Sequence, residues 1–354
     1  MAIYLNGKAY DVIVGLDVDK RSYSVTCLGE DGLKKQLRMP ASSDKLLNYA
    51  RNQFGGKRLL FAYEAGPTGW GLFDDLKKSG EDCFMIHPAA MSVPSNQIVK
   101  NNRLDSERIA EQVKGGLVGS IRVPSESYRS LRHFVSLRHD CAATQKAFKQ
   151  KIRALLLFEN LAHLLPDADK AWNQHYRNTL TQIPLKPAAA YKMKSYAEDL
   201  ELSRKKLLEV QKEVRKFCTE DSLIKKNLLL LESIPGIGKV IAPTLLARIG
   251  DPADLKNVRE LGGFCGLVPR EKSTGDTVRR GSISHQGDRV LRGLLIEGAW
   301  VAIRKDKELC EFYHRIKTKR EKQGGPQIAI TAVARKLTNR IYVVLKEQRN
   351  YVVR

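Results

Sequence analysis

Short apolar runs alternate with amphipathic stretches over the first third of the chain. Residues 12–18 are apolar and rich in β-branched side chains, a pattern that predicts a buried strand. Residues 23–28 and 33–39 predict two more strands around the turn Gly29-Glu30-Asp31-Gly32, and residues 58–63 and 82–86 predict a fourth and a fifth. Amphipathic stretches at 42–53, 72–78 and 106–115 predict helices, the first of them capped by Ser42 or Ser43.

This order of elements predicts the fold class of the first third. Three strands, a helix, a strand, a helix, a strand and a helix follow one another in an RNase H-like (RuvC-like) domain, which is an α/β fold with a mixed sheet. We place this domain at residues 1–126. The pattern of the rest of the chain is mostly helical, so we expect an α/β domain followed by α-helical regions.

The middle of the chain, residues 127–227, has an almost wholly helical pattern. Apolar residues recur at helical spacing from Leu131 to Phe158, breaks follow at Pro166 and at residues 184–187, and residues 196–217 predict a charged amphipathic helix. Long charged helices of this type commonly pair as coiled coils. We therefore expect a coiled-coil dimerisation region, and a helical subdomain that packs on its own chain is the alternative.

The last third, residues 228–354, predicts a mostly helical C-terminal domain. Ile234-Pro235-Gly236-Ile237-Gly238-Lys239 lies between two apolar helical stretches and is similar to a helix-hairpin-helix motif, which can offer backbone N–H groups and Lys239 to a phosphate. An ordinary helical turn is the alternative. Residues 262–287 predict a loop rich in Gly, Ser and Arg, and residues 291–303 and 328–345 predict two closing helices.

Charge narrows the class of partner. The chain has 354 residues, with 61 Lys and Arg against 39 Asp and Glu, a formal net charge of +22. Such self-repulsion favours a polyanionic partner, so we expect nucleic acid rather than a merely basic protein. The sequence contains no long apolar run, no signal-peptide pattern and no Cys-x-x-Cys pair, which argues against a membrane span, secretion and a structural zinc site. We expect a cytoplasmic, nucleoid-associated protein.

Three acidic residues occupy positions that could form a metal site. Asp17 ends the first predicted strand, Glu64 ends the fourth, and Asp105 begins the last helix of the predicted domain. In an RNase H-like sheet the two strands are neighbours, so we expect the three carboxylates at one edge, where hard oxygen ligands bind Mg²⁺. The alternative is that Asp17 and Asp105 only terminate a strand and cap a helix.

A hydroxyl-rich stretch of the predicted loop is the second candidate for chemistry. Its Ser and Thr residues lie between Gly residues and near cations that could stabilise a reacting phosphate. From the residues alone, phosphate binding or exposure to solvent is the preferred interpretation. The cations concerned are Arg270, Lys272, Arg279 and Arg280.

Several motifs together resemble one protein family nearly from end to end. The matching segments are Gly15-Leu16-Asp17-Val18, Tyr63-Glu64-Ala65, 99–105 with Ile109-Ala110, Ile234-Pro235-Gly236-Ile237-Gly238, Gly266-Leu267-Val268-Pro269-Arg270, Ser273-Thr274-Gly275, Ile283-Ser284, 287–295 and Ala334-Arg335-Lys336-Leu337. With these segments the chain resembles the DEDD-type transposases, or recombinases, of bacterial insertion sequences, which are guided by a bridge or seeker RNA.

The resemblance implies an activity and a set of partners. It implies a RuvC-like domain, a coiled coil and a C-terminal transposase domain with a catalytic serine. It also implies Mg²⁺, donor and target double-stranded DNA, a structured non-coding guide RNA, and a homo-oligomer in which dimers assemble to a tetramer. Active sites in the family are composite, with acids from one subunit and serine from another.

The family's functional residues map onto this sequence one at a time. Asp17 and Glu64 match the first two acids and Asp105 matches the fourth, whereas Asn102 stands where the family has its third acid. Ser273 matches the nucleophile, with Thr274 as the alternative one position on and Ser282 and Ser284 as weaker ones. The nucleic-acid-binding residues implied are Lys239, Arg270, Lys272, Arg279, Arg280, Arg289 and Arg292.

Three rival functions remain open at the level of sequence. A RuvC-like junction nuclease would use metal-activated water and form no covalent intermediate. An actin-like or sugar-kinase-like ATPase also opens with a segment such as Gly15-Leu16-Asp17-Val18, but Asp19-Lys20-Arg21 follows here instead of a Gly-rich phosphate loop. A non-enzymatic nucleic-acid-binding protein is the third.

Overall fold

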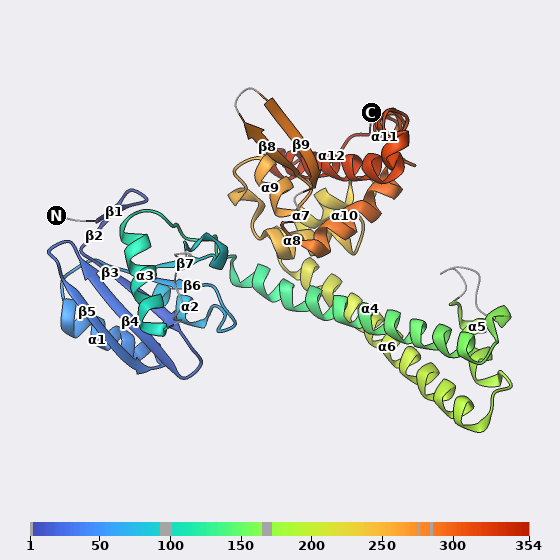
Figure 1. The fold of residues 1–354 in the computed structure, drawn as a ribbon, viewed down its shortest axis with the longest axis horizontal. Helices are drawn as coiled ribbons and strands as arrows, with labels where there is room; N and C mark the ends of the chain where they lie inside the picture. Colours follow the sequence, from blue (N-terminus) through green and yellow to red (C-terminus); the bar gives the residue numbers. More distant parts are fainter. Residues whose placement is uncertain (1–2, 93–100, 165–171, 275–276, 284–285, 354) are drawn as a thin grey trace. The chain divides into compact units, whose positions relative to one another are not determined.

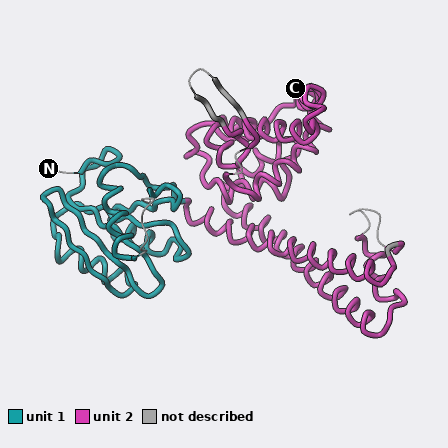
Figure 2. The backbone as a smooth tube through the Cα atoms, viewed as in Figure 1, with its two compact units in different colours: residues 1–123 teal, residues 124–354 magenta. Residues whose placement is uncertain are grey.

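The computed structural model describes residues 3–92, 101–164, 172–274, 277–283 and 286–353 (Figure 1). The chain divides into two compact units, residues 1–123 and 124–354 (Figure 2). The first unit is a mixed α/β structure, and the second, over its described residues, is helical apart from one β-hairpin. Among the described residues, no helix combines the length and apolar character needed to cross a membrane.

Unit 1 is built on a five-stranded mixed sheet with the order β5-β4-β3-β6-β7. Strand β4 is antiparallel to β3 and β5, whereas β6 is parallel to β3 and β7. This arrangement is consistent with the RNase H-like domain predicted from the order of elements. The strands of the sheet are β3 (Val12–Val18), β4 (Ser22–Gly29), β5 (Lys34–Pro40), β6 (Leu59–Glu64) and β7 (Asp82–Ile86).

Helices cover both faces of this sheet. Side chains alternate along β3, so that Val14 and Leu16 join the core under α1 (Ser43–Phe54) and α2 (Gly71–Lys78), while Ile13 joins the core under α3 (Asn102–Lys114). Gly15 marks the point where α3 crosses β3. A Cβ atom there would collide with Ser106 O and lie 2.6 Å from Ala110 N. Only glycine therefore lets α3 pack this closely on β3.

The structure extends the prediction for unit 1 at two places. A short hairpin, β1 (Ile3–Leu5) with β2 (Lys8–Tyr10), precedes the sheet and turns through Asn6 and Gly7, which both have positive φ. Helix α3 begins at Asn102, four residues before the predicted start, because Asn101 caps it by accepting a hydrogen bond from Arg103 N at 3.0 Å.

Unit 2 begins with two long helices that pack along one another within the same chain (Figure 1). They are α4 (Glu126–Phe158) and α6 (Pro187–Glu220), and Pro187 starts α6 at a position where proline is well tolerated. The residues that α6 buries recur at spacings of mostly three, four and seven, the pattern of a helix seam. Short elements cap the far end of the pair, namely η2 (Ala162–Leu164), α5 (Gln174–Thr179) and η4 (Leu180–Gln182).

The rest of unit 2 is a helical body around α12, which buries side chains along most of its length. One continuous core joins this body to the adjoining ends of α4 and α6. Helix α7 runs through residues 227 and 228, where the predicted middle region meets the predicted C-terminal domain. The elements of the body are α7 (Ser222–Glu232), α8 (Ile241–Ile249), η5 (Pro252–Asp254), α9 (Val258–Phe264), β8 (Pro269–Thr274), β9 (Thr277–Ile283), α10 (Arg289–Ala302), α11 (Lys307–Lys319), η6 (Glu321–Gln323) and α12 (Gly325–Glu347).

Two predictions for this body are wrong. The loop predicted at residues 262–287 contains the end of α9 and the antiparallel hairpin of β8 and β9. Three helices close the chain instead of two, because α11 lies between the predicted pair. Asp306 caps the start of α11, because its side chain accepts a hydrogen bond from Leu309 N at 3.0 Å.

Candidate active site

The sheet of unit 1 places Asp17 and Glu64 at neighbouring strand positions. Strands β3 and β6 run parallel, with Leu16 opposite Tyr63, and Asp17 and Glu64 are the next residue on each strand. Asp17 continues the alternation of Ile13 along β3, and Glu64 continues that of Ala62 along β6, so both acids lie on the face that α3 covers. Glu64 is exposed and Asp17 is half-buried. The structure therefore brings together the two acids that end these strands.

Asp105 lies in the first turn of α3, over the same face of the sheet. The neighbouring Ser106 anchors this turn, because its hydroxyl shares a 2.9 Å hydrogen bond with Thr26 on β4. The Asp105 carboxylate forms an ion pair with Arg108, one turn further along α3. Within the described part of the chain, no group of three His, Cys, Asp or Glu residues is close enough to hold a metal ion. Asp105 thus shares the face of the pair without completing a three-acid cluster.

Asn102 is the first residue of α3, and Asn101 before it is the cap. It lines a cleft of about 620 Å³ together with Ser24 and Arg38. Ser24 is also the strand partner of Asp17, so the cleft borders the strand position of that acid. We call the edge of the sheet that carries Asp17 and Glu64 the carboxylate edge. Asn102 therefore lies beside the carboxylate edge, on a cleft that is also lined by the cation Arg38.

Two arginines of this cleft were not singled out from the sequence. Arg103 donates from Nε to Gln36 Oε1 at 2.6 Å, and Arg38 donates to Ser22 Oγ at 3.0 and 3.1 Å. The cleft is lined by both arginines. Lone arginines on a strand and a helix carry no motif, so only the pairing of β4 with β5 under α3 reveals that they converge.

The donor set at this edge fits a hard divalent cation. Mg²⁺ in proteins commonly takes one or two carboxylates and completes its shell with water and substrate phosphates. Asp17 and Glu64 supply two carboxylates at adjacent strand ends, and the Asn102 amide adds a neutral oxygen nearby. The residues present are therefore compatible with Mg²⁺, with Asp105 held by Arg108 as a further carboxylate on the same face.

The second candidate stretch forms the β8–β9 hairpin. Ser273 pairs with Val278 and Thr274 pairs with Thr277, so both hydroxyl residues lie in β8 next to the turn. Gly275 and Ser284 fall outside the described residues, and Ser282 is an exposed position of β9. Ser273 is thus carried on a two-stranded ribbon of the helical body.

Basic residues line both strands and the base of this hairpin. Lys272 pairs with Arg279, and Arg270 is exposed at the start of β8. Arg289 is exposed on α10, whereas Arg292 points back to Gly266 O and Gln286 O at 3.5 and 3.4 Å. Arg292 therefore braces the segment that leads into α10, in addition to the binding role that its motif implies.

The turn between α7 and α8 carries the proposed helix-hairpin-helix. Gly236 adopts φ +88° and faces the α10 backbone, where a Cβ atom would lie 2.9 Å from Gly298 C. This glycine is therefore required for packing inside the protein, not for approach to a phosphate. Gly238 faces open space and Lys239 is exposed, so the outer part of the turn remains accessible.

A cationic groove runs from this turn to α4. It has a volume of about 720 Å³ and is lined by Lys239 together with Arg138, His139 and Lys146 of α4, and by Glu297 of α10. Burial lowers the pKa of Arg138, while Glu297 opposes that change. The Nε atom of Arg138 is buried and has no hydrogen-bond partner within the described residues. This groove could not be predicted from the sequence, because α4 and the turn are about 100 residues apart.

Two family models match the chain over the regions that hold these residues. A DEDD transposase model of IS110, described as a transposase, matches residues 14–159. The model described as the transposase IS116/IS110/IS902 family matches residues 228–314. The first match spans the carboxylate edge, and the second spans the α7–α8 turn and the hairpin with Ser273.

Curated proteins with similar sequences include relatives of nearly full length. A putative transposase, y4qE, of Sinorhizobium fredii is 25% identical over 370 residues, which cover 96% of this chain and 90% of that protein. The transposase for insertion sequence element IS1328 of Yersinia enterocolitica is 24% identical over 315 residues, which cover 83% of this chain and 84% of that protein. A pilin gene-inverting protein of Moraxella bovis is 26% identical over 184 residues, 51% of this chain and 56% of that protein.

The two matches occur in the same order along the chain as the two candidate sites. A five-stranded mixed sheet in unit 1 agrees with a DEDD-type N-terminal domain. Such a domain suggests the use of a divalent metal ion. This chain belongs to the IS116/IS110/IS902 family of insertion-sequence transposases, of DEDD type, and is an enzyme of DNA transposition.

Proposed function

We propose that this transposase cuts and rejoins DNA strands with Ser273 as the nucleophile and Asp17, Glu64 and Asp105 as the acids of a Mg²⁺ site. The observation that carries the proposal is the pair of carboxylates at neighbouring strand ends of an RNase H-like sheet. A relative named as a pilin gene-inverting protein supports it, because inverting a gene requires strands to be cut and rejoined.

The covalent step follows from the chemistry of a serine hydroxyl. The Ser273 oxygen forms a bond to phosphorus while the bond from phosphorus to a deoxyribose oxygen breaks. The serine proton is lost, and the released deoxyribose oxygen takes up a proton and becomes a free hydroxyl. One strand end is thereby held as a phosphodiester on Ser273, and a hydroxyl of another strand reverses the step to rejoin DNA.

Cations of the hairpin would serve this step. Negative charge builds on the phosphate as the new bond forms, and fixed positive groups stabilise it. By the pairing register, Arg280 belongs to the same face of the ribbon as Ser273. Lys272 and its partner Arg279 belong to the opposite face. Because consecutive positions of a strand belong to opposite faces, Ser273 and Thr274 cannot serve the same face of the ribbon, which is why a choice between them is testable.

Asp17 and Glu64 would hold Mg²⁺, with Asn102 and Asp105 as oxygen ligands from α3. When bound, the ion stabilises charge on the attacking and leaving oxygens. For Asp105 to take part, its carboxylate must leave the ion pair with Arg108. That exchange gives α3 a role in assembling the site.

The proposal includes partners beyond DNA. We infer a structured guide RNA from the same element, since backbone and shape recognition suits a broad basic surface. We also infer dimers that assemble to a tetramer through α4 and α6, whose outer surfaces expose large apolar side chains. These are Leu137, Leu157, Phe158, Tyr191, Leu202 and Leu208.

A covalent trapping experiment tests the proposal. The purified chain, its guide RNA and a DNA substrate nicked near the cleavage point should yield a protein–DNA adduct at Ser273, identified by mass spectrometry. Ser273→Ala should bind both nucleic acids normally and form no adduct and no strand-exchange product, and Thr274→Val is the matched control. An adduct at residue 274, or products from Ser273→Ala, would overturn the assignment, and absence of any adduct with full cleavage would favour a junction nuclease.

The RNA guide has its own test. Recombination should require RNA at the time of assembly, so RNase treatment of the chain before DNA is added should abolish it. Full recombination after that treatment would contradict RNA guidance while leaving the serine chemistry intact.

A further inference from the structure

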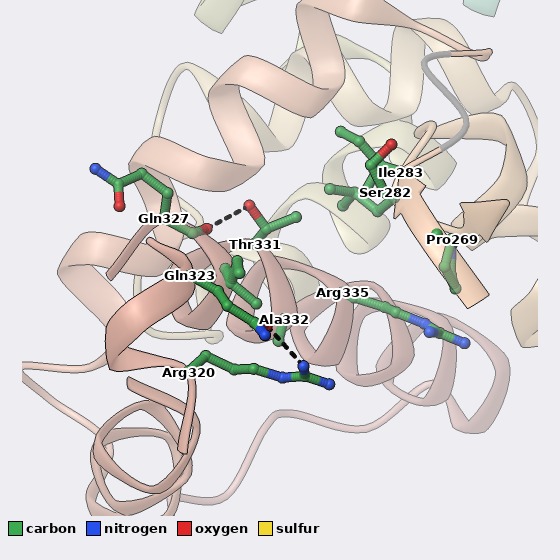
Figure 3. A pocket seen from close by; sticks show the side chains of 12 residues that line it. Pro269, Ser282, Ile283, Arg320, Gln323, Gln327, Thr331, Ala332 and Arg335 are labelled. Carbon is green, nitrogen blue, oxygen red and sulfur yellow. Dashed lines mark hydrogen bonds between the residues drawn. The ribbon is translucent and has the colours of Figure 1, made fainter. Parts of the chain in front are cut away.

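A pocket of about 620 Å³ lies between the base of the β8–β9 hairpin and the helices behind it. Figure 3 shows Ser282 and Ile283 of β9 on one side, and Arg320, Thr331 and Arg335 on the other. The hairpin supplies one wall and α12 supplies the other. This pocket belongs to neither the carboxylate edge nor the α7–α8 turn.

The pocket combines an apolar floor with a polar rim. Its floor includes Pro269, Ile283 and Ala332, and Ile328 remains 40% exposed although it is a large apolar side chain. Exposed apolar surface of this kind inside a concave site is typical of a place that a ligand covers.

The rim carries positive charge and no carboxylate. Arg320 and Arg335 are its charged members, and no Asp or Glu is among the residues that line the pocket. Arg320 is steadied by Gln323, whose Oε1 accepts its Nη1 hydrogen bond at 2.8 Å, while Thr331 donates to the backbone oxygen of Gln327 at 2.7 Å (Figure 3). The side chain of Arg335 is exposed at the rim. An anionic ligand with a flat apolar part matches this lining.

The pocket lies close to the proposed nucleophile along β8. Pro269, in its wall, precedes Ser273 by four residues, and a strand rises about 3.3 Å per residue, so the two positions are about 13 Å apart. Successive phosphates of one DNA strand are spaced about 3.4 Å along a duplex axis and further apart when the strand is extended. A strand that crosses Ser273 therefore reaches the pocket within a few nucleotides.

We propose that this pocket binds one unpaired nucleotide of the DNA strand that crosses Ser273. The base lies on the apolar floor of Ile283, Ile328 and Ala332, and Arg335 and Arg320 bind the adjoining phosphate. The inference rests on the proposed function, since it places a DNA strand on this hairpin. Holding a nucleotide out of the duplex would fix the register of the strand relative to the nucleophile.

Photocrosslinking of the full-length chain tests the pocket directly. The probe is a single-stranded DNA oligonucleotide with 5-iodouracil at one position, moved stepwise along the strand. One position, a few nucleotides from the cleavage point, should crosslink to a peptide containing residues 328–335. Ala332→Trp fills the floor and should lower that crosslink and the oligonucleotide affinity about tenfold. An unchanged affinity and crosslink would overturn the proposal.

Arg335→Gln should leave the fold intact, because the Arg335 side chain is exposed. It should lower affinity about fivefold or more and reduce the slope of log affinity against log salt by about 0.7, the value for one phosphate of a single strand. Lys322→Gln is the matched control, since Lys322 is exposed on η6 but does not line the pocket, and it should change the affinity much less. Equal effects of the two substitutions would show that general positive charge, and not the pocket, accounts for the affinity, and would overturn the proposal.

Two further arms separate the sources of failure. An RNA oligonucleotide of the same sequence should crosslink less than DNA, and capture of RNA alone would overturn the assignment to DNA. The Ser273→Ala chain should crosslink as well as the parent does, because binding does not require the nucleophile. If the Ser273→Ala chain is active in strand exchange and still crosslinks, the pocket is supported and Ser273 is excluded as the nucleophile.

Discussion

The two units of this transposase differ most in charge. Residues 1–123 contain 17 Lys and Arg against 14 Asp and Glu, a net +3, whereas residues 124–354 contain 44 against 25, a net +19. The nearly balanced unit carries the carboxylate pair of Asp17 and Glu64 on a five-stranded sheet. The basic unit carries Ser273 on a two-stranded ribbon.

The difference points to separate tasks. A sheet covered by helices on both faces holds acidic side chains in fixed positions, and a unit with little excess positive charge repels a divalent cation less than a strongly basic unit does. The helical unit holds most of the excess positive charge, which attracts polyanions regardless of sequence.

Removing one acid should have the largest effect on this comparison. Asp17→Asn keeps the size of the side chain but removes a charged ligand, so strand exchange should fall about 10⁴-fold or more while DNA binding stays unchanged. The measurement is the rate of strand exchange beside the affinity for DNA. Asp19→Asn, two residues on at an exposed position, removes the same charge and should retain activity. Equal losses in both variants would place the effect in general charge instead of the site.

Salt should separate the units next. If six to ten phosphates are neutralised, DNA affinity should fall by about 10³–10⁵ between 50 and 200 mM salt. Lys239→Gln, in the basic unit, should lower the slope of this dependence by about 0.9, whereas Lys57→Gln, exposed in unit 1, should leave it unchanged. A flat response, or equal slopes in the two variants, would contradict the division of tasks.

The packing of α3 on the sheet gives a stability test. A methyl group at Gly15 collides with the α3 backbone at Ser106, so Gly15→Ala should lower the free energy of unfolding by about 1–3 kcal/mol. Urea unfolding followed by circular dichroism measures this. Gly71→Ala is the control, because no atom lies within 4 Å of the added Cβ, and it should be neutral or slightly stabilising. Equal stability of the two variants would disprove the close contact of α3.

The smallest effect concerns Asn102. If its amide oxygen is a ligand, Asn102→Asp should lower the Mg²⁺ concentration for half-maximal activity about two- to fivefold, since affinity for hard cations rises with ligand charge. The measurement is a Mg²⁺ titration of strand exchange. An active chain with an unmoved titration would exclude Asn102 from the ligand set, and activity gained only with Asp would show that Asn102 disables the site.

The sheet of unit 1 was predictable because each strand carries its own local pattern. Residues 12–18 and 82–86 are strands at the predicted bounds, and Ser42 caps the first helix as expected. The β8–β9 hairpin was not predictable, because its polar and glycine-rich residues match a loop and only their pairing makes a strand. Helix α11 was missed because it is highly charged, and its start depends on Asp306 as a cap.

The candidate site shows the same limit. Asp17 and Glu64 could be named because strand ends are local features, and their proximity follows from the predicted strand order. The ion pair of Asp105 with Arg108 joins two residues three apart on one helix, whereas the approach of Arg38 to Asn102 depends on where α3 starts and crosses the sheet. The second contact joins distant segments, so it leaves no spacing in the sequence to detect.

One mixing experiment tests most directly whether the acids of one chain and the serine of another serve the same phosphodiester. Asp17→Asn and Ser273→Ala chains are each assembled with RNA and DNA, alone and as an equimolar mixture, and strand exchange is measured. We expect no product from either variant alone and recovered product from the mixture, where intact acids of one subunit meet an intact serine of another. Product from either variant alone, or none from a mixture shown to contain both chains in one complex, would contradict it.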